Sequence, residues 1–143
     1  MLDSTNSPTP EWGFSTEPSE QPVPRALYVV VREDLSSGLR AAQAAHAVAE
    51  ICLRRPEAAW KWHEEGNYLI VLGAKNEEGV LNAFFEAKHF DMPRELFREP
   101  DLHLEATAVA MFPEPADNHV FGDYPLACRE TWVDRFVRWT GAK

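Results

Sequence analysis

The chain has 143 residues, 45% of them apolar and 26% charged, and its formal net charge is −9 at pH 7. This length and apolar content predict one globular domain with its own core. The acidic balance argues against a general nucleic-acid coat, because phosphate binding requires a basic surface. No apolar run approaches the roughly 20 residues that cross a bilayer, and no secretory signal is visible, so we expect a cytoplasmic protein without a membrane partner.

Residues 1–24 differ in composition from the rest of the chain. They contain five of the 11 prolines, four acidic residues and no Lys or Arg. No hydrophobic period runs through them, so we expect a disordered tail here and a single folded domain over residues 25–143. The motif EWGF, with Trp12 and Phe14, leaves a docking role open, either on the domain or on a protein partner of the acidic tail.

The folded region opens with a strand that is followed by a helix. The β-branched run ALYVVV at residues 26–31 is typical of a strand buried on both faces. Ser36 or Ser37 is a suitable N-cap for a helix. This helix should continue to about Arg55, since Pro56 disfavours its extension.

A second helix, a second strand and a third helix follow. Pro56 suits the first turn of a shorter helix, and Gly66 lies past its predicted end. The run YLIVLG at residues 68–73 predicts another buried strand. Asn76 then caps the third helix. Its predicted inward-facing residues are Val80, Leu81, Phe84 and Phe85.

The last part of the chain predicts one more strand and one more helix. Residues 96–103 look extended but are interrupted by Pro100, and LEATAVAMF at residues 104–112 predicts a strong strand. The run RETWVDRFVRW at residues 129–139 has apolar residues at helical spacing and predicts a helix that docks on the sheet. Strands and helices in this order predict an α/β sandwich.

The first helix carries many small residues. At about 100° per residue, one arc of roughly 200° is apolar, and we expect it to pack closely against the sheet. Its members are Ala41, Ala42, Ala44, Ala45, Val48, Ala49, Ile51, Cys52 and Leu53. The opposite stripe consists of Leu39, Gln43, His46, Glu50 and Arg54, with Arg40 at its margin. This stripe is either a solvated surface, in which His46 pairs with Glu50, or part of a site.

The start of this helix is a candidate anion site. Free backbone N–H groups around Ser36, Ser37 and Gly38 lie at a helix N-terminus, next to the carboxyl end of the first strand. Open α/β sheets bind ligands at such edges.

The same residues carry a resemblance to a known family. The stretch LYVVVREDLSSGLRAAQAAHA resembles the opening of the archaeal and eukaryotic type of peptidyl-tRNA hydrolase, with its apolar strand, Arg-Asp-Leu step, Ala-Ala-Gln run and His-Ala pair. The resemblance continues to EPDLHLEATAVAMFP, so it covers residues 26–113. It implies a three-layer α/β sandwich with a mixed four-stranded sheet and helices on both faces. It also implies cleavage of the ester that joins a peptide to the tRNA 3′ end.

Five residues match site positions of this family. Gly38, Gln43 and His46 match its glycine, glutamine and histidine. Asp101 matches its aspartate, and Thr107 matches a threonine on a strand. The segment EPDLHLEA stands where the family has a longer one. This sequence therefore differs from the family pattern next to Asp101, one of the expected site residues.

A second departure concerns charge. Leu39 occupies the position of the family's catalytic lysine, and Arg40 is the nearest replacement for its positive charge. Asp101 or Glu99 would orient the attacking water, and Thr107 is the third candidate catalytic residue. The predicted substrate-binding residues are Ser36, Ser37, Gly38, Gln43, His46 and Glu99.

Two functions stay open on this basis. The first is a peptidyl-tRNA hydrolase-like enzyme that acts on peptidyl- or aminoacyl-tRNA or on a smaller ester. The second is a catalytically silent member of the fold that binds an anionic ligand or a protein partner through the same cleft, and either could form a homodimer. The histidines and the two cysteines lack metal-ligand spacing and no Gly-rich phosphate loop is present, so we expect neither a metal nor a cofactor.

Overall fold

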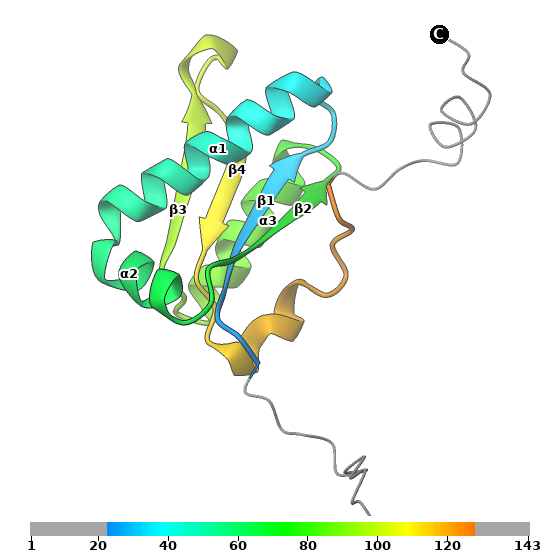
Figure 1. The fold of residues 1–143 in the computed structure, drawn as a ribbon. Coiled ribbons are helices and arrows are strands. Elements are labelled where there is room, and N and C mark those ends of the chain that lie inside the picture. The colour runs from blue at the N-terminus through cyan, green and yellow to red at the C-terminus, as the bar shows by residue number, and fades with distance from the viewer. Residues whose placement is uncertain (1–22, 128–143) are drawn as a thin grey trace, which may run out of the picture.

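Four strands form one mixed sheet with helices on both of its faces (Figure 1). The structure is a computed structural model that describes residues 23–127. The strands lie in the order β2-β1-β4-β3. Their bounds are Ala26–Arg32 for β1, Tyr68–Ala74 for β2, Arg94–Glu99 for β3 and Glu105–Met111 for β4. β1 is parallel to β2 and antiparallel to β4, and β3 is antiparallel to β4, which confirms the predicted fold class.

The helices form the two outer layers. The helices α1 (Ser37–Arg54) and α2 (Pro56–Glu64) lie on one face. The helix α3 (Glu77–His89) and the 3-10 helix η2 (Pro115–Phe121) lie on the other. A short 3-10 helix, η1 (Pro100–Leu102), joins β3 to β4. None of the helices in residues 23–127 has the length and apolar character needed to span a membrane.

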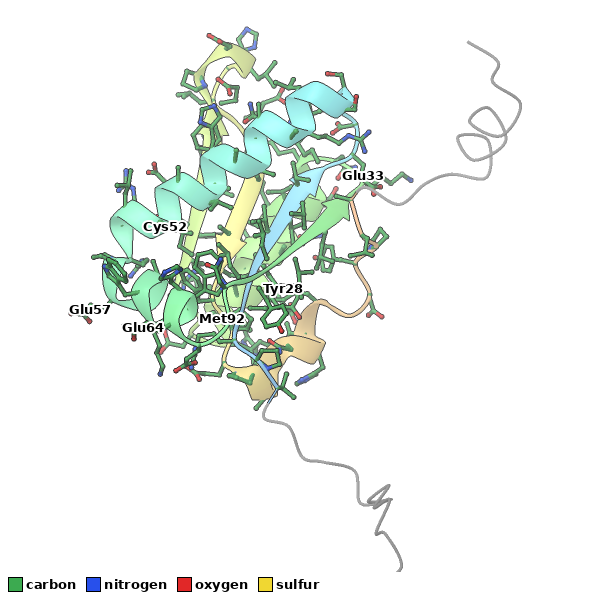
Figure 2. The ribbon with its side chains drawn as sticks, in the orientation of Figure 1. Tyr28, Glu33, Cys52, Glu57, Glu64 and Met92 are labelled. Atoms are coloured by element: carbon green, nitrogen blue, oxygen red, sulfur yellow. The ribbon has the colours of Figure 1, made fainter. Side chains whose placement is uncertain are left out.

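The central strand β1 divides the core into two apolar clusters. Leu27 and Val29 face α1, and both are fully buried. Tyr28 and Val30 point to the opposite face, where the Tyr28 ring lies 6.0 Å from the ring of Phe121 in η2 (Figure 2). A strand flanked on both faces must be apolar along its buried length, which is why residues 26–31 are a continuous apolar run.

The predicted helix boundaries are confirmed. The Ser36 hydroxyl oxygen accepts a hydrogen bond from the Leu39 backbone N–H at 3.4 Å, and α1 ends one residue before Arg55. Asn76 Oδ1 accepts from the Gly79 N–H at 3.1 Å, which caps α3. Pro56 lies in the first turn of α2, where its missing N–H costs nothing.

The predicted orientation of α1 is wrong. Its buried residues are Gln43, Ala44, Ala47 and Ile51, whereas four alanines of the expected inner arc and Leu53 are exposed. Alanine is compatible with either environment, so the apolar arc of an alanine-rich helix locates the core poorly. The same correction applies to Phe85, which is 57% exposed, because α3 buries the smaller residues Val80, Ala83 and Ala87 instead.

Two further segments lie at the edges of the sheet. The extended stretch before Pro100 is β3, and it ends where the proline starts η1. Beyond η2, residues 125–127 run antiparallel along β2, with hydrogen bonds from Gly73 N–H to Pro125 O and from Ala127 N–H to Val71 O. The predicted C-terminal helix at residues 129–139 and nearly all of the predicted tail lie outside the described residues.

Candidate active site

A buried glutamine connects three elements of the fold. Gln43 on α1 is 1% exposed. Its Nε2 donates to Glu99 Oε2 at 2.6 Å, and its Oε1 accepts from the Thr107 hydroxyl at 2.5 Å. An ionised carboxylate only accepts hydrogen bonds, so the amide must turn its NH₂ to Glu99 and its oxygen to Thr107. This chain of bonds links α1 to the end of β3 and to β4.

Thr107 reaches Gln43 because β4 contains a bulge. Phe97 pairs with Ala108 and Arg98 pairs with Ala106, so Thr107 has no partner in the β3–β4 register. Strict alternation would direct Thr107 away from α1, since its neighbour Ala108 already faces α1. The extra residue redirects the side chain towards the helix, as bulges next to functional sites do. The bulge therefore creates the Thr107–Gln43 contact.

Glu99 is held in its charged form. Hydrogen bonds from the Gln43 amide and from the Asp101 backbone N–H, at 3.3 Å, keep the pKa of this carboxyl below its usual range, and the nearby His46 contributes in the same direction. Burial opposes these effects only weakly. Glu99 also caps η1 through the bond to Asp101 N–H, so it fixes the turn that carries Asp101.

His46 lies on the solvent side of the cluster formed by Gln43, Glu99 and Thr107. Its exposed ring stacks on Phe97 of β3, with 4.8 Å between centroids and 10° between planes. The predicted ion pair between His46 and Glu50 does not form, because Glu50 pairs with Arg54 one turn further along the helix. The structure thus brings Gln43, Glu99, Thr107, His46 and the backbone of Asp101 together.

The residues at the start of α1 form a second group. Ser36, Ser37 and Gly38 are exposed in the first turn, and open space surrounds Gly38. Arg40 Nη1 donates to the Ala127 carbonyl at 3.4 Å, and its buried Nε has no hydrogen-bond partner among the described residues. Ala127 lies along β2 at one edge of the sheet, whereas Glu99 ends β3 at the other. Arg40 is therefore directed away from the Gln43 cluster.

An ion-pair network, to which the sequence reasoning assigned no role, supports both groups. Arg32 at the end of β1 is 11% exposed and donates to both oxygens of Asp34 at 2.9 Å and to Glu105 at 2.5 Å. The carboxylates of Asp34 and Glu105 raise the pKa of Arg32, and the Arg32 guanidinium in turn lowers the pKa of Asp34. The network fixes the loop before α1 and the start of β4. The signal was present as the Arg-Glu-Asp step after the first buried strand.

Other parts of the described surface have fewer candidate catalytic or metal-binding side chains. A hollow of about 460 Å³ lies near the end of β2 and is lined by residues such as Lys75, Gly79 and Tyr124, none of which the sequence singled out. Within residues 23–127, no group of three or more His, Cys, Asp or Glu side chains is arranged to hold a metal ion. The Gln43 cluster is accordingly the candidate active site.

Comparison with known proteins identifies the family. The family model described as "Peptidyl-tRNA hydrolase PTH2" matches residues 26–126, from the start of β1 to the segment that pairs with β2. A peptidyl-tRNA hydrolase from Methanopyrus kandleri is 37% identical over an alignment of 109 residues that covers 68% of this chain and 94% of that protein. The matched residues contain the whole sheet and every member of the Gln43 cluster. The chain belongs to the PTH2 family of peptidyl-tRNA hydrolases.

Proposed function

We propose that this chain hydrolyses the ester that joins a peptide to the 3′ end of tRNA. The single observation that supports this function best is the buried Thr107–Gln43–Glu99 chain of hydrogen bonds, because it holds polar groups rigidly at the surface of an otherwise apolar core. Family membership supplies the substrate class. Since peptidyl-tRNA arises in translation, we propose the cytoplasm as its location.

In this proposal Asp101 is the general base. Both carboxylate oxygens of Glu99 already accept hydrogen bonds, and its lowered pKa makes Glu99 a weak base that is better suited to positioning. Asp101 is exposed on the turn that Glu99 caps. Its carboxylate removes a proton from water as the water oxygen attacks the ester carbonyl carbon. The bond to the ribose oxygen then breaks, that oxygen takes up the proton from Asp101, and free tRNA and the peptide acid leave, the acid losing its remaining proton to solvent.

The positively charged groups act on the substrate. Arg40 and the N–H groups around Ser36, Ser37 and Gly38 would bind phosphate oxygens of the tRNA at the positive end of the α1 dipole. Because Arg40 is directed away from the Gln43 cluster, we assign it to phosphate binding rather than to the catalytic charge that is absent at Leu39. His46, stacked on Phe97, offers an exposed ring face for a base at the tRNA 3′ end.

The test is release of free tRNA from a peptidyl-tRNA pool by the pure protein. Asp101→Asn should lower turnover by about 10²–10⁴-fold, as removal of a general base does. Asp117→Asn is the matched control, since Asp117 also lies in the first turn of a 3-10 helix but belongs to η2. Equal activity of the two variants would contradict the assignment.

Two further variants test the charge. Arg40→Ala should reduce turnover, and Leu39→Lys should increase it by restoring the family's residue. If the wild type releases no tRNA and only Leu39→Lys gains activity, the chain is a silent member of the family that retains the binding site. A homodimer and a partner of the acidic tail stay predictions, which a size measurement and a binding assay would test.

A further inference from the structure

One face of the edge strand β2 has no helix over it. The helix α1 packs over β1, β4 and β3 but not over β2 (Figure 1). A helix is about 10 Å wide and strands lie about 4.8 Å apart, so one helix covers about two or three strands of a sheet. Leu69 shows the result, since it is 49% exposed although its register partner Leu27 on β1 is fully buried.

The uncovered face continues onto the side of α1. Gln43 and His46 contact β4 and β3, so the opposite flank of α1 is turned towards β2. At about 100° per residue, that flank is small and apolar throughout. Its residues are Ala41, Ala45, Val48 and Cys52, the first two exposed and the others partly exposed. We call this flank, together with Leu69 and Val71 of β2, the β2 groove.

The end of the described chain lies in the β2 groove. Ala127 donates its N–H to Val71 O at 3.0 Å, accepts a hydrogen bond from Arg40 of α1, and buries its methyl group in the α1-side cluster. At the other end, the Trp62 indole N–H donates to Tyr68 O at 2.7 Å and so limits the groove near α2. The described chain therefore ends in the groove.

The next residues have the composition that this groove requires. Residues 129–139, RETWVDRFVRW, contain Trp132, Val133, Phe136, Val137 and Trp139. On a helix these side chains would span an arc of about 160°, with the acidic residues and most of the arginines on the remaining surface. Eleven helical residues measure about 16 Å, which equals the length of α1 from Ala41 to Cys52. Bulky aromatic side chains also complement a flank of alanines.

We propose that residues 129–139 form an amphipathic helix that docks in the β2 groove and completes the α1-side layer of the sheet. The segment lies beyond the residues that match the family, which end at Leu126, so this docking would be an addition to the family's domain. The occupant is this chain's own segment because the described chain ends in the groove at Ala127 and a sequence with the length and apolar spacing of such a helix follows directly.

Hydrogen exchange of the full chain, followed by mass spectrometry, tests the docking. Amides of residues 129–139 should exchange at least tenfold more slowly than in a synthetic peptide of residues 128–143. Ala41→Asp places a charge in the groove and should remove this protection. Ala42→Asp is the matched control, since Ala42 is also exposed in the first turns of α1 but lies about 100° further from the groove. Protection of β1 amides reports that both variants are folded.

Three results would overturn the proposal. The first is peptide-like exchange of residues 129–139 in the wild type. The second is an equal effect of Ala41→Asp and Ala42→Asp on folded protein. The third is protection that grows with protein concentration, because the groove would then be occupied by a second copy of the chain. Phe136→Asp gives an independent check from the side of the segment, and it should abolish protection of the segment while leaving β1 unchanged.

Discussion

At the scale of single residues, Gln43 is buried although helical periodicity predicts it on the polar surface of α1. The sequence put it on the polar stripe of α1, yet it is buried, because Thr107 and Glu99 satisfy both ends of its amide. Burial of an amide is tolerated only with such partners, and the partners lie 56 and 64 residues away. Its membership in a site was predictable from the family resemblance, but its burial and the bulge at Thr107 were not, since both depend on strand register.

Substitution of Thr107 measures how much this arrangement contributes. Thr107→Val keeps the shape but removes the donor, which leaves the buried Gln43 oxygen unsatisfied and should lower the free energy of unfolding by about 1–3 kcal/mol. Thr107→Ser retains the hydroxyl and should lose less of the Gln43 contact, although it removes a methyl group. Denaturant titration of both variants is the measurement, and a Val variant as stable as the wild type would show that the bond is unimportant.

The hydrogen bond from Gln43 predicts how the Glu99 side chain titrates. Because the pKa of Glu99 is lowered in the folded protein, it stays ionised at neutral pH, and its bond to Gln43 persists as pH falls below the ordinary value near 4.5. Gln43→Leu removes the largest cause of this shift, so in that variant the pKa of Glu99 should rise. Titration of the Glu99 side chain by NMR should show this rise, and an unchanged titration would contradict the assigned bond.

At the scale of elements, α1 explains why strands were easier to predict than a helix face. Nearly continuous apolar stretches identify β1 and β4, and a strand buried on both faces requires no choice of face, whereas alanine fits both the core and the surface of α1. The caps at Ser36 and Asn76 were predictable because they depend only on local hydrogen bonds.

The corrected orientation of α1 can be tested by enlarging two alanines. Ala47 is fully buried, so Ala47→Leu should overpack the sheet face and lower the free energy of unfolding by about 1–3 kcal/mol. Ala49→Leu, at an exposed position of the same helix, should be nearly neutral. Thermal or chemical unfolding separates the two outcomes, and equal losses would mean that the orientation is still wrong.

The cap of α3 offers a second test at this scale. Asn76→Ala removes the acceptor of the Gly79 N–H and should cost about 0.5–2 kcal/mol of stability. Asn82→Ala is the control, since Asn82 is exposed inside the same helix and gains helix propensity. A destabilised Asn82 variant with an unaffected Asn76 variant would contradict this account.

At the scale of the whole molecule, one buried and one largely buried arginine join segments that are distant in sequence. Arg25 is 8% exposed and bonds to Glu65 after α2 and to Glu114 before η2, while Arg32 connects β1 to β4. The pKa values of Asp34 and Glu114 are lowered in consequence. The mixed sheet itself was predicted through the family resemblance, but these long-range pairs were not, because nothing in the local sequence specifies the partner of a charge.

These ion pairs predict that the folded protein loses stability in acid. A carboxyl whose pKa is depressed by folding stabilises the native state above its unfolded-state pKa, near 3.8 for Asp34 and 4.5 for Glu114, and this stabilisation disappears as pH falls through the folded values. Unfolding should therefore become easier below about pH 4.5. Glu114→Gln should flatten this acid limb, and the exposed Glu64→Gln should not. Denaturation midpoints between pH 2 and 7 provide the comparison, and identical limbs would contradict it.

The position of β1 in the sheet has a consequence for the order of folding during synthesis. Among the strands of residues 23–127, β1 leaves the ribosome first, yet it is an interior strand, and one of its two neighbours, β4, is not complete until Met111 has emerged. Until then the apolar β1 can pair only with β2, which leaves its other edge open. Contacts between segments as distant in sequence as β1 and β4 form slowly. Nascent chains that end before β4 should therefore be the species most prone to aggregate and to recruit chaperones.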